Sequence, residues 1–304
     1  AELRVPDTVV RVLPDVPAID RAFDYLVPEQ LGDQVRVGTM VRIPLSGRRV
    51  AGWVLQVAVD PVPGMRLAEV SKVVGLGPPP EIVELCRWAA WRWAGRLATM
   101  LRLASPERVV AAAAPVRVRP ATRQPLDTVG VAALRAGPGV HVVEVSPTTD
   151  PLGPATSAAA VGQVIVVVPQ REMADRVARG LRAAGSAVAR WPRDWSAAAG
   201  GATIVGGRAA VFAPAPRLAA IVVVDEHDQM LQSESSPTWH AREVAVERAR
   251  RAGVPCVLMS PCPSIEALSA QLPDGGAALW ALPGPGAPAT PTVELPVPSE
   301  RVSS

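Results

Sequence analysis

The sequence predicts an α/β protein in which a small β-barrel-like domain at the N-terminus precedes a parallel-sheet domain. Its 304 residues exceed the roughly 100–200 residues of one typical domain. Residues 8–59 contain short runs in which apolar and polar side chains alternate, as they do in antiparallel strands. Residues 140–259 instead alternate apolar runs with amphipathic segments, which indicates parallel strands covered by helices.

The first domain is expected to span residues 1–106 and to combine short strands with one helix. The expected strands are 8–12, 35–43, 50–59 and 70–76, with a loop at 17–28 and a turn at 45–48. Prolines at 78–80 precede a helix expected from 81 to 103. Proline is favoured at the start of a helix, and the apolar residues that follow recur at helical spacing.

The next segment, 107–138, is rich in alanine, proline and arginine and is expected to form a basic linker. Its arginines are expected to make salt-sensitive contacts with phosphates if the partner is a nucleic acid. They are Arg108, Arg117, Arg119, Arg123 and Arg135. A solvated linker without a binding role is the plainer interpretation of the same composition.

The second domain is expected at 139–283, followed by a flexible tail at 284–304 that is too rich in proline to build a core. Short runs rich in β-branched residues are typical of strands buried on both faces. The expected strands are 140–145, 164–168, 203–205, 221–224 and 256–259, and the clearest helices are 171–184 and 240–252.

Composition limits the function only loosely. A formal charge of +3 and a pI near 9.1 permit a polyanionic partner without requiring one. The three cysteines form no CxxC pair, so we expect no zinc site and a reducing, cytoplasmic environment. The N-terminal residues resemble neither a signal peptide nor a membrane span, and no membrane association is expected.

Polar residues follow several of the expected parallel strands, where doubly wound domains bind ligands. Asp225 and Glu226 follow the run at 221–224, and Arg208 closes a Gly-Gly-Arg segment after 203–205. An ordinary turn and helix cap would also place acids after a strand. No GxSxG nucleophile motif is present and the histidines lack metal-ligand spacing, so we assign no catalytic or metal-binding residue.

The order of these motifs resembles one family of superfamily-2 helicases, the primosomal protein N′ or PriA replication-restart helicases. GGRAAVFAP at 206–214 is similar to that family's GTRSALFAP, and the acidic box at Asp225 follows at the family's distance. WHARE at 239–243 resembles YHARD, and MSPCPSIEAL at 259–268 resembles GSATPSLEAL. The resemblance covers residues 8 to about 282. It implies that the second domain is a RecA-like helicase lobe 1.

The N-terminal domain matches the same family through IDRAFDYLVPE at 19–29, which is similar to LDRPFDYLVPE. The resemblance implies a domain that captures the 3′ end of the nascent leading strand at a stalled fork. Phe23, Asp24 and Tyr25 would form the pocket: the rings stack on a base and the carboxylate accepts a hydrogen bond from the 3′-hydroxyl. Burial in the barrel is the alternative role for Phe23 and Tyr25.

Further DNA contacts are expected on the neighbouring hairpin. Gly47 matches a glycine whose backbone lines the family's pocket, and Lys72 lies one residue beyond the position of the family's lysine. Arg48 and Arg49, together with Arg42, are expected to contact phosphates without regard to sequence.

The phosphate loop of the family, GVTGSGKT, is replaced by EVSPTTDP at 144–151. Asp150 stands near the place of the lysine, and prolines remove backbone N–H donors. The acidic box is one residue shorter than the family's DEEH, and Pro261-Cys262 replaces its Ala-Thr. The resemblance therefore implies a degenerate nucleotide site, made by Asp150, Asp225, Glu226 and Arg208.

We expect a DNA-binding protein of replication restart or primosome assembly that recognises the 3′ end at forked DNA, without helicase activity and without a cofactor. The implied partners are branched DNA with a 3′ end and primosome proteins, the replicative helicase loader or single-strand-binding protein. The alternative is an ATP-dependent 3′-5′ DNA helicase whose second lobe and zinc region are missing from this chain. A degraded fragment without function is a third interpretation.

Overall fold

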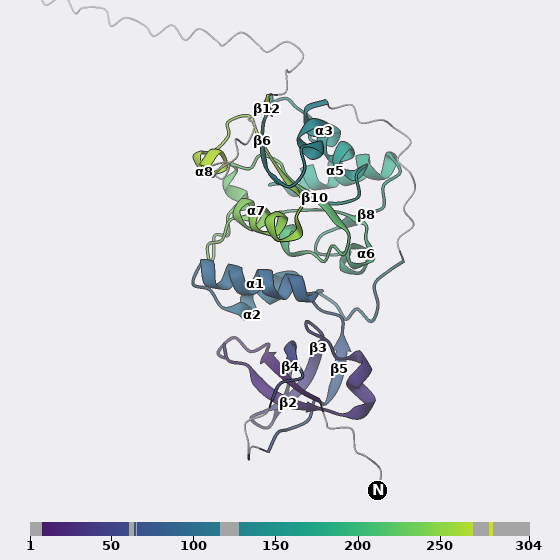
Figure 1. Ribbon diagram of the computed structural model, residues 1–304, viewed down its shortest axis with the longest axis vertical. Helices are drawn as coiled ribbons and strands as arrows, with labels where there is room; N and C mark the ends of the chain where they lie inside the picture. The colour runs from purple at the N-terminus through teal and green to yellow at the C-terminus, as the bar shows by residue number, and fades with distance from the viewer. Residues whose placement is uncertain (1–7, 61–63, 65, 116–127, 270–279, 282–304) are drawn as a thin grey trace, which may run out of the picture.

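The computed structural model describes residues 8–60, 64, 66–115, 128–269 and 280–281. These residues form two units that lie end to end, with a β unit at the bottom of Figure 1 and a parallel-sheet unit at the top. Two helices lie between the two sheets. The predicted fold class, an antiparallel β unit followed by a parallel α/β unit, is confirmed.

The β unit is an antiparallel sheet in the order β2-β1-β4-β3-β5. Its strands are β1 (Thr8–Pro14), β2 (Phe23–Val27), β3 (Met40–Leu45), β4 (Arg48–Val57) and β5 (Lys72–Gly75), with a 3-10 helix η1 (Glu29–Gln34). Leu26 of β2 donates to the Ala68 carbonyl and accepts from the Val70 amide, each at 2.9 Å. These bonds join the two edges of the sheet, so the unit closes like a barrel around nine buried side chains, Val12, Tyr25 and Ile43 among them.

The hairpin between β3 and β4 has the predicted two-residue turn. Ser46 and Gly47 have φ angles of 47° and 76°, as both central residues of a type I′ turn require. Two other expectations are wrong. Residues 23–27, expected in a loop, form β2, and the strand expected from 35 begins only at Met40.

The single helix expected at 81–103 is two helices, α1 (Pro80–Arg92) and α2 (Leu97–Ala104). The chain turns sharply between them, where Ala94 has a φ of 47°. A side chain at Gly95 would lie only 2.5 Å from Pro237 of the second unit. The break lets the chain pass close to that proline, a tertiary requirement that helical periodicity does not reveal.

The second unit is a parallel sheet in the order β12-β6-β11-β10-β7-β9-β8. Its strands are β6 (Gly139–Glu144), β7 (Gln163–Val167), β8 (Val188–Arg190), β9 (Thr203–Gly206), β10 (Leu218–Val223), β11 (Pro255–Ser260) and β12 (Trp280–Ala281). Its helices are α3 (Thr128–Arg135), α4 (Leu152–Ala159), α5 (Arg171–Ala183), α6 (Trp195–Gly200), α7 (Ala241–Ala252) and α8 (Ile265–Ser269), with 3-10 helices η2 (Arg208–Phe212) and η3 (Gln229–Leu231). All five residues of β7 are buried, as its run of β-branched side chains predicts.

Alternate side chains of this sheet enter two different cores. Val164 and Val166 of β7 pack in a cluster with α4 and α5, whereas Ile165 and Val167 pack in a cluster with α6 and α7. The second cluster also contains α1, α2 and Leu13 and Trp53 of the β unit. One continuous apolar core therefore joins the two units.

Hydrogen bonds reinforce this junction. The Trp53 indole donates to Ser105 Oγ at 2.8 Å, and the Trp195 indole donates to the Ala104 carbonyl at 2.9 Å. Both bonds end at the last turn of α2, one from each unit. The orientation of the β unit on the second unit is thus set by buried, directional contacts.

The segment predicted as a linker, 107–138, has more structure than expected. Its C-terminal part forms α3, and Val110 accepts a hydrogen bond of 2.7 Å from the Leu76 amide. Ser196 of the second unit binds the Ala112 carbonyl at 2.9 Å and the Ala114 amide at 3.0 Å. Residues 116–127 with three of the predicted arginines, and the predicted tail, lie outside the described residues.

Candidate functional site

Asp24 lies on β2 directly opposite Arg11 of β1. The Arg11 guanidinium donates from Nε to Asp24 Oδ1 at 2.8 Å and from Nη2 to Oδ2 at 3.0 Å, which is a two-point ion pair. The side chains are 42% and 14% exposed, so the pair lies at the surface. Each carboxylate oxygen has two lone pairs, and each therefore keeps the capacity for one more hydrogen bond.

The two aromatic residues beside Asp24 point to the other face of β2. Tyr25 is only 4% exposed, and its hydroxyl donates to the Pro44 carbonyl at 3.0 Å. Burial raises the pKa of Tyr25, as it does for any phenol removed from water. Tyr25 therefore fills the barrel, and the stacking surface expected of it is not exposed. Phe23 is half-buried, with the Arg21 guanidinium 5.5 Å from its ring centre.

A second group of predicted residues lies on strands β3, β4 and β5. Arg42 is paired with Lys72 across β3 and β5, and Pro44 is paired with Arg49 across β3 and β4. Val41 and Ile43 face the barrel core, so the alternation of the strand places Arg42, Arg49 and Lys72 together on the outer face. Arg42 Nε is buried and has no hydrogen-bond partner among the described residues.

The predicted DNA-binding residues thus form two sets. Arg48 and Arg49 are exposed at the start of β4 beside the Gly47 turn, and Lys72 is exposed at the start of β5. Among the described residues, no hydrogen bond or ion pair joins Asp24 to Lys72. The sequence interpretation missed Arg11. The alternation of apolar and polar residues in β1 predicts that Arg11 points outward. It does not predict that Asp24 is its partner.

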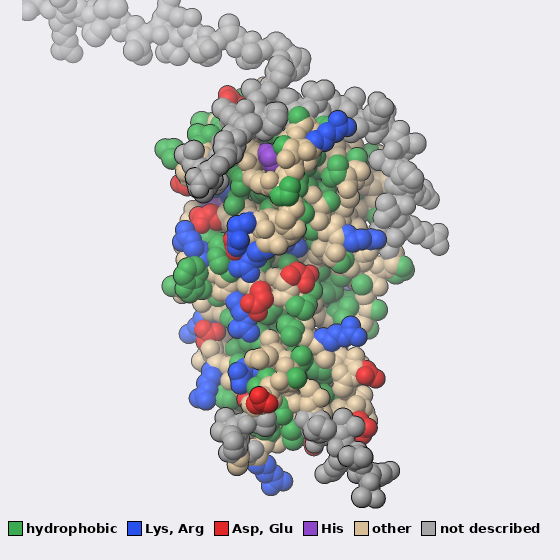
Figure 2. Space-filling model, in the orientation of Figure 1, with side chains coloured by type: hydrophobic (Ala, Val, Ile, Leu, Met, Phe, Trp, Pro, Cys, Tyr) green, Lys and Arg blue, Asp and Glu red, His purple; other side chains and the backbone are tan. Residues whose placement is uncertain are grey.

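Charge is not gathered in a single patch on the face that Figure 2 displays. Cationic side chains are spread over both units there, with acidic side chains between them. This agrees with a formal charge of only +3. Contacts with a polyanion would therefore depend on local clusters such as the one on β3, β4 and β5.

In the second unit, the loop 145–151 lies where the family's phosphate loop is expected, between β6 and α4. It lines a hollow of about 270 Å³ together with Asp225 and Arg176. Two amides are bound within this region: Thr149 N–H donates to the Ser146 carbonyl at 2.9 Å, and Leu152 N–H at the start of α4 donates to Asp150 Oδ1 at 3.1 Å. Asp150 therefore places its carboxylate at the first amide of α4, where an anion would bind in a phosphate loop.

Asp225 adds a second carboxylate to this hollow. Its φ of 49° is a strained, left-handed conformation for a residue other than glycine. Burial, with a smaller contribution from Asp228, raises the pKa of Asp225. Two prolines without N–H groups, two carboxylates and one arginine do not fit a nucleoside triphosphate, which requires free N–H donors and a lysine.

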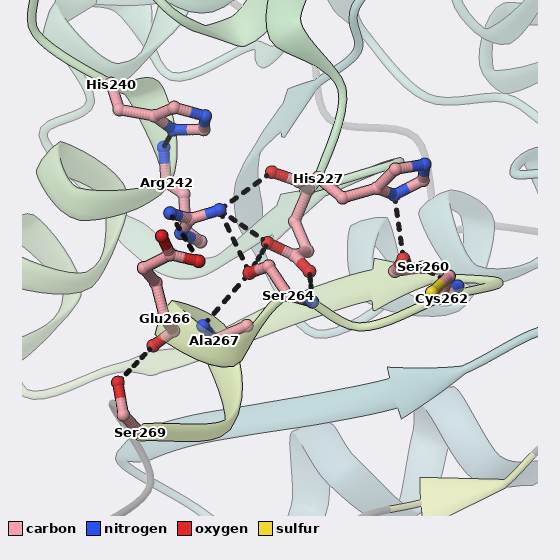
Figure 3. Close-up of polar contacts among 10 residues, drawn as sticks. His227, His240, Arg242, Ser260, Cys262, Ser264, Glu266, Ala267 and Ser269 are labelled. Atoms are coloured by element: carbon pink, nitrogen blue, oxygen red, sulfur yellow. Dashed lines mark hydrogen bonds and ion pairs between the residues drawn. The ribbon is translucent and has the colours of Figure 1, made fainter.

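Glu226 points away from that hollow into a buried network. Its side chain is fully buried and accepts from Arg242 Nη1 at 2.8 Å, from the Ser264 amide at 2.7 Å and from Ser264 Oγ at 2.8 Å. Figure 3 shows Arg242 and Ser264 turned toward the same point from α7 and the loop after β11. Glu266, two residues after Ser264, lies 3.8 Å from Arg242 Nη2.

The histidines beside this network are also engaged. His227 Nδ1 and Ser260 Oγ are 2.8 Å apart, and Ser260 Oγ also accepts from the Cys262 amide at 2.9 Å (Figure 3). His240 Nδ1 accepts from the Arg242 amide at 3.1 Å and caps α7. Burial, followed by the nearby Arg242 charge, lowers the pKa of His240 to about 4. The segments 225–228, 239–243 and 259–268 are therefore linked by hydrogen bonds.

The four residues predicted for the nucleotide site are divided among three places. Asp150 and Asp225 line one hollow, and Glu226 belongs to the buried network. Arg208 binds the Met230 carbonyl at 3.1 Å and lines a separate hollow with Trp191 and Trp239. The described residues contain no cluster of three histidines, cysteines or carboxylates that could hold a metal. Within the described part of the chain, no helix is long and apolar enough to cross a membrane.

Comparisons with known proteins relate the chain to replication restart. Residues 11–106 match the family described as the 3′DNA-binding domain (3′BD) of PriA. Over 270 residues the chain is 30% identical to the probable replication restart protein PriA of Mycobacterium tuberculosis (strain CDC 1551 / Oshkosh). That alignment covers 78% of this chain and 41% of the relative, so the chain spans less than half the relative's length.

Two further likenesses are more limited. The replication restart protein PriA of Treponema pallidum (strain Nichols) is 42% identical over 69 residues, or 23% of this chain and 10% of that protein. The solved structure of an S. cerevisiae dbp5 variant bound to a gle1 variant and ip6 aligns with 68% of this chain and 51% of its own chain. Its TM-score is 0.40 and its sequence identity 12%.

Proposed function

We propose that the chain binds branched DNA at a strand's 3′ end, because residues 11–106 match the family of PriA 3′DNA-binding domains and the chain is similar to replication restart protein PriA. The observation that carries the proposal is the match of the β unit to that domain family. Asp24, held at its surface by Arg11, supplies a polar group suited to the task.

The proposed contact is a hydrogen bond from the terminal 3′-hydroxyl to Asp24. Arg11 holds the carboxylate in one orientation, and the remaining lone pairs of the two oxygens face outward from the pair. Arg11 is therefore a positioning residue whose charge also favours the nearby phosphodiester. Phe23 is half-buried against the barrel core on the face of β2 opposite Asp24, so the proposed contact rests on Asp24 and Arg11.

The cations on the outer face of β3, β4 and β5 would bind the DNA backbone. Arg49 and Lys72 are exposed, whereas Arg42 is half-buried and its Nη1 donates to the Arg49 carbonyl at 3.5 Å. Phosphate contacts of this kind position a protein on DNA without reading sequence. Gly47 allows the tight turn that brings Arg48 and Arg49 to the end of the hairpin.

The test compares two forks that differ only in a free 3′-hydroxyl or a 3′-phosphate on the leading strand. The phosphate removes the donor and brings negative charge to a carboxylate. A hydrogen bond to a charged group contributes about 1.5–3 kcal/mol, so we expect roughly one to two decades tighter binding of the hydroxyl fork. Fluorescence anisotropy of labelled forks measures both affinities.

Asp24→Ala should remove the preference, and Arg11→Ala should reduce it, while binding that depends on salt remains. Asp33→Ala is the matched control, because Asp33 is an exposed acid of the same unit. Equal affinities of the unmutated chain for the two forks would overturn the proposed 3′-end contact.

We also propose that the chain acts without ATP, as a DNA-binding protein of replication restart or primosome assembly. The support is the loop 145–151, which contains two prolines without N–H groups and whose Asp150 accepts from the first amide of α4. Calorimetry should detect no ATP binding in the micromolar range. Micromolar binding that is lost in Asp225→Ala would favour the alternative, an ATP-dependent helicase completed by a second lobe.

The proposed partners beyond DNA are primosome proteins, the replicative helicase loader or single-strand-binding protein. Their support is the relation to replication restart proteins alone. Binding of each purified partner to the chain, with and without a fork, tests this part separately.

A further inference from the structure

A hollow of about 580 Å³ lies beside the β unit, where strands β1 and β4 meet the junction of α1 and α2. Its apolar lining includes Leu13 and Leu55 of the strands and Ala90 and Leu97 of the helices. These four side chains are buried or half-buried, so they form a firm floor. Nothing in the proposed 3′-end contact uses this hollow.

Trp91 stands at the edge of the hollow and is 78% exposed. Such exposure is unusual for a residue that buries well, and the neighbouring tryptophans of α1 do not share it. Trp88 and Trp93 pack edge to face with ring centres 5.5 Å apart, and Arg92 lies over Trp93. No aromatic or cationic partner is recorded for the Trp91 ring among the described residues, and one flat apolar face is available to a ligand.

The opposite wall is the segment that leads into β2. Asp20 and Ala22 line the hollow, and the chain before them is tied to α2. Arg96 binds the Pro17 carbonyl, and Arg102 Nη2 lies 2.6 Å from Asp15 Oδ1. The wall is thus held in place by α2 and does not depend on a ligand for its shape.

The rim carries both kinds of hydrogen-bonding group. Asp20 provides carboxylate acceptors, and Arg87 provides N–H donors, of which one meets Glu84 Oε1 at 3.0 Å. A flat aromatic wall, an apolar floor and a rim with donors and acceptors suit a nucleobase, which has two apolar faces and a polar edge. An apolar side chain in the hollow would offer no hydrogen bond to Asp20 or to the remaining N–H donors of Arg87.

The position of the hollow indicates which base would enter it. Asp20 and Ala22 are four and two residues before Asp24. In extended chain this corresponds to about 7–13 Å, or roughly two to four base steps of a stacked strand. We propose that the hollow takes a nucleobase a few nucleotides before the 3′ end, stacked on Trp91. The proposal rests on the proposed function and adds a second contact to it.

The experiment measures fork affinity for the full chain with Trp91→Ala and Trp91→Phe. Base stacking on an aromatic side chain is strong enough that its loss should weaken binding about 10-fold, whereas phenylalanine should keep most of the affinity. Ile265→Ala is the matched control, because Ile265 is 82% exposed on the second unit. Urea unfolding of each variant verifies that the fold is retained.

Abasic sites placed one at a time before the 3′ end identify the base. One position should weaken binding of the unmutated chain, and the same abasic site should have no further effect in Trp91→Ala. Unchanged fork affinity in Trp91→Ala overturns the inference. So does a dimer of the chain, seen by sedimentation, that Trp91→Ala dissociates, because the hollow would then belong to a second copy.

The two proposals fail in distinguishable ways. If the hydroxyl and phosphate forks bind equally while the Trp91 and abasic effects remain coupled, the Asp24 contact fails and the base site stands. If the 3′-hydroxyl preference is present but Trp91→Ala changes nothing, only the base site is overturned.

Discussion

Each unit of this chain contains an arginine–carboxylate pair with a shortest N–O distance of 2.8 Å, yet the two pairs have opposite surroundings. Arg11 and Asp24 in the β unit are 42% and 14% exposed. Arg242 and Glu226 in the second unit are 8% and 0% exposed, and Ser264 adds two hydrogen bonds to the same carboxylate. The same kind of ion pair therefore lies at the surface of the β unit and in the interior of the second unit.

The comparison shows that a motif residue and a functional residue need not coincide. Glu226 stands in an acidic box typical of nucleotide-hydrolysing lobes, but its hydrogen-bonding capacity is occupied by the fold around it. Within the part of the chain that the structure describes, Asp24 has Arg11 as its one partner, and its 14% exposed carboxylate retains lone pairs for a further hydrogen bond. We infer that a surface polar group with free hydrogen-bonding capacity indicates a binding residue better than its presence in a sequence motif does.

The largest expected effect is the loss of stability in Glu226→Ala. Removing one partner of a buried pair leaves the buried Arg242 with only the exposed Glu266 at 3.8 Å, and such a loss costs about 3–5 kcal/mol of unfolding free energy. The equivalent change in the surface pair, Asp24→Ala, should cost less than about 1 kcal/mol. Urea unfolding followed by tryptophan fluorescence measures both.

Glu266→Ala is the control for the buried pair, because Glu266 lies 3.8 Å from the same arginine but is 68% exposed. It should change stability by less than about 1 kcal/mol. Similar losses in Glu226→Ala and Asp24→Ala would contradict the distinction between the two pairs.

A smaller effect on stability is expected from pH, through His240 of the second unit. The pKa of His240 is about 4 in the folded chain, against 6.5 for an unperturbed histidine. Between these values the unfolded chain binds the proton more readily. The contribution of His240 to the free energy of unfolding is therefore complete above pH 6.5. It decreases as pH falls toward 4, by up to about 3 kcal/mol. Unfolding curves at successive pH values give the slope.

His240→Asn isolates this contribution, because asparagine also caps a helix N-terminus but does not titrate. Its stability should vary less between pH 6.5 and pH 4 than that of the unmutated chain. Parallel pH profiles for the two proteins would show that His240 does not carry the dependence.

The smallest expected effect is on the salt dependence of DNA binding, and it tests whether the cations of the β unit contact phosphates while those of the second unit do not. If Arg49 and Lys72 bind phosphates, each change to glutamine should reduce the slope of log affinity against log salt by about 0.7–0.9. Arg250→Gln should leave the slope unchanged, since Arg250 in the second unit is paired with Glu247 at 2.8 Å. A uniform reduction in all three variants would indicate DNA contacts over both units.

Local sequence patterns predicted much of this fold. Period-two alternation and β-branched runs located β1, β4, β7 and β10, and amphipathic spacing located α5 and α7 within a residue or two. The two-residue turn at Ser46 and Gly47 was predictable because few residue pairs tolerate positive φ twice. Short elements such as β8 and α6 were missed, because three to six residues hold too little periodicity.

The sequence by itself determined the class of the fold, the order of its elements and the acidic character of the loop that would meet a nucleotide. Only the tertiary structure decided which polar groups are occupied. Arg11 meets Asp24 through strand register, and Glu226 meets Arg242 and Ser264 across 16 and 38 residues. Local patterns specify the direction of a side chain within its own element. Its partner depends on how distant elements pack, and that packing buries Tyr25 and Glu226 while it leaves Asp24 and Trp91 at the surface.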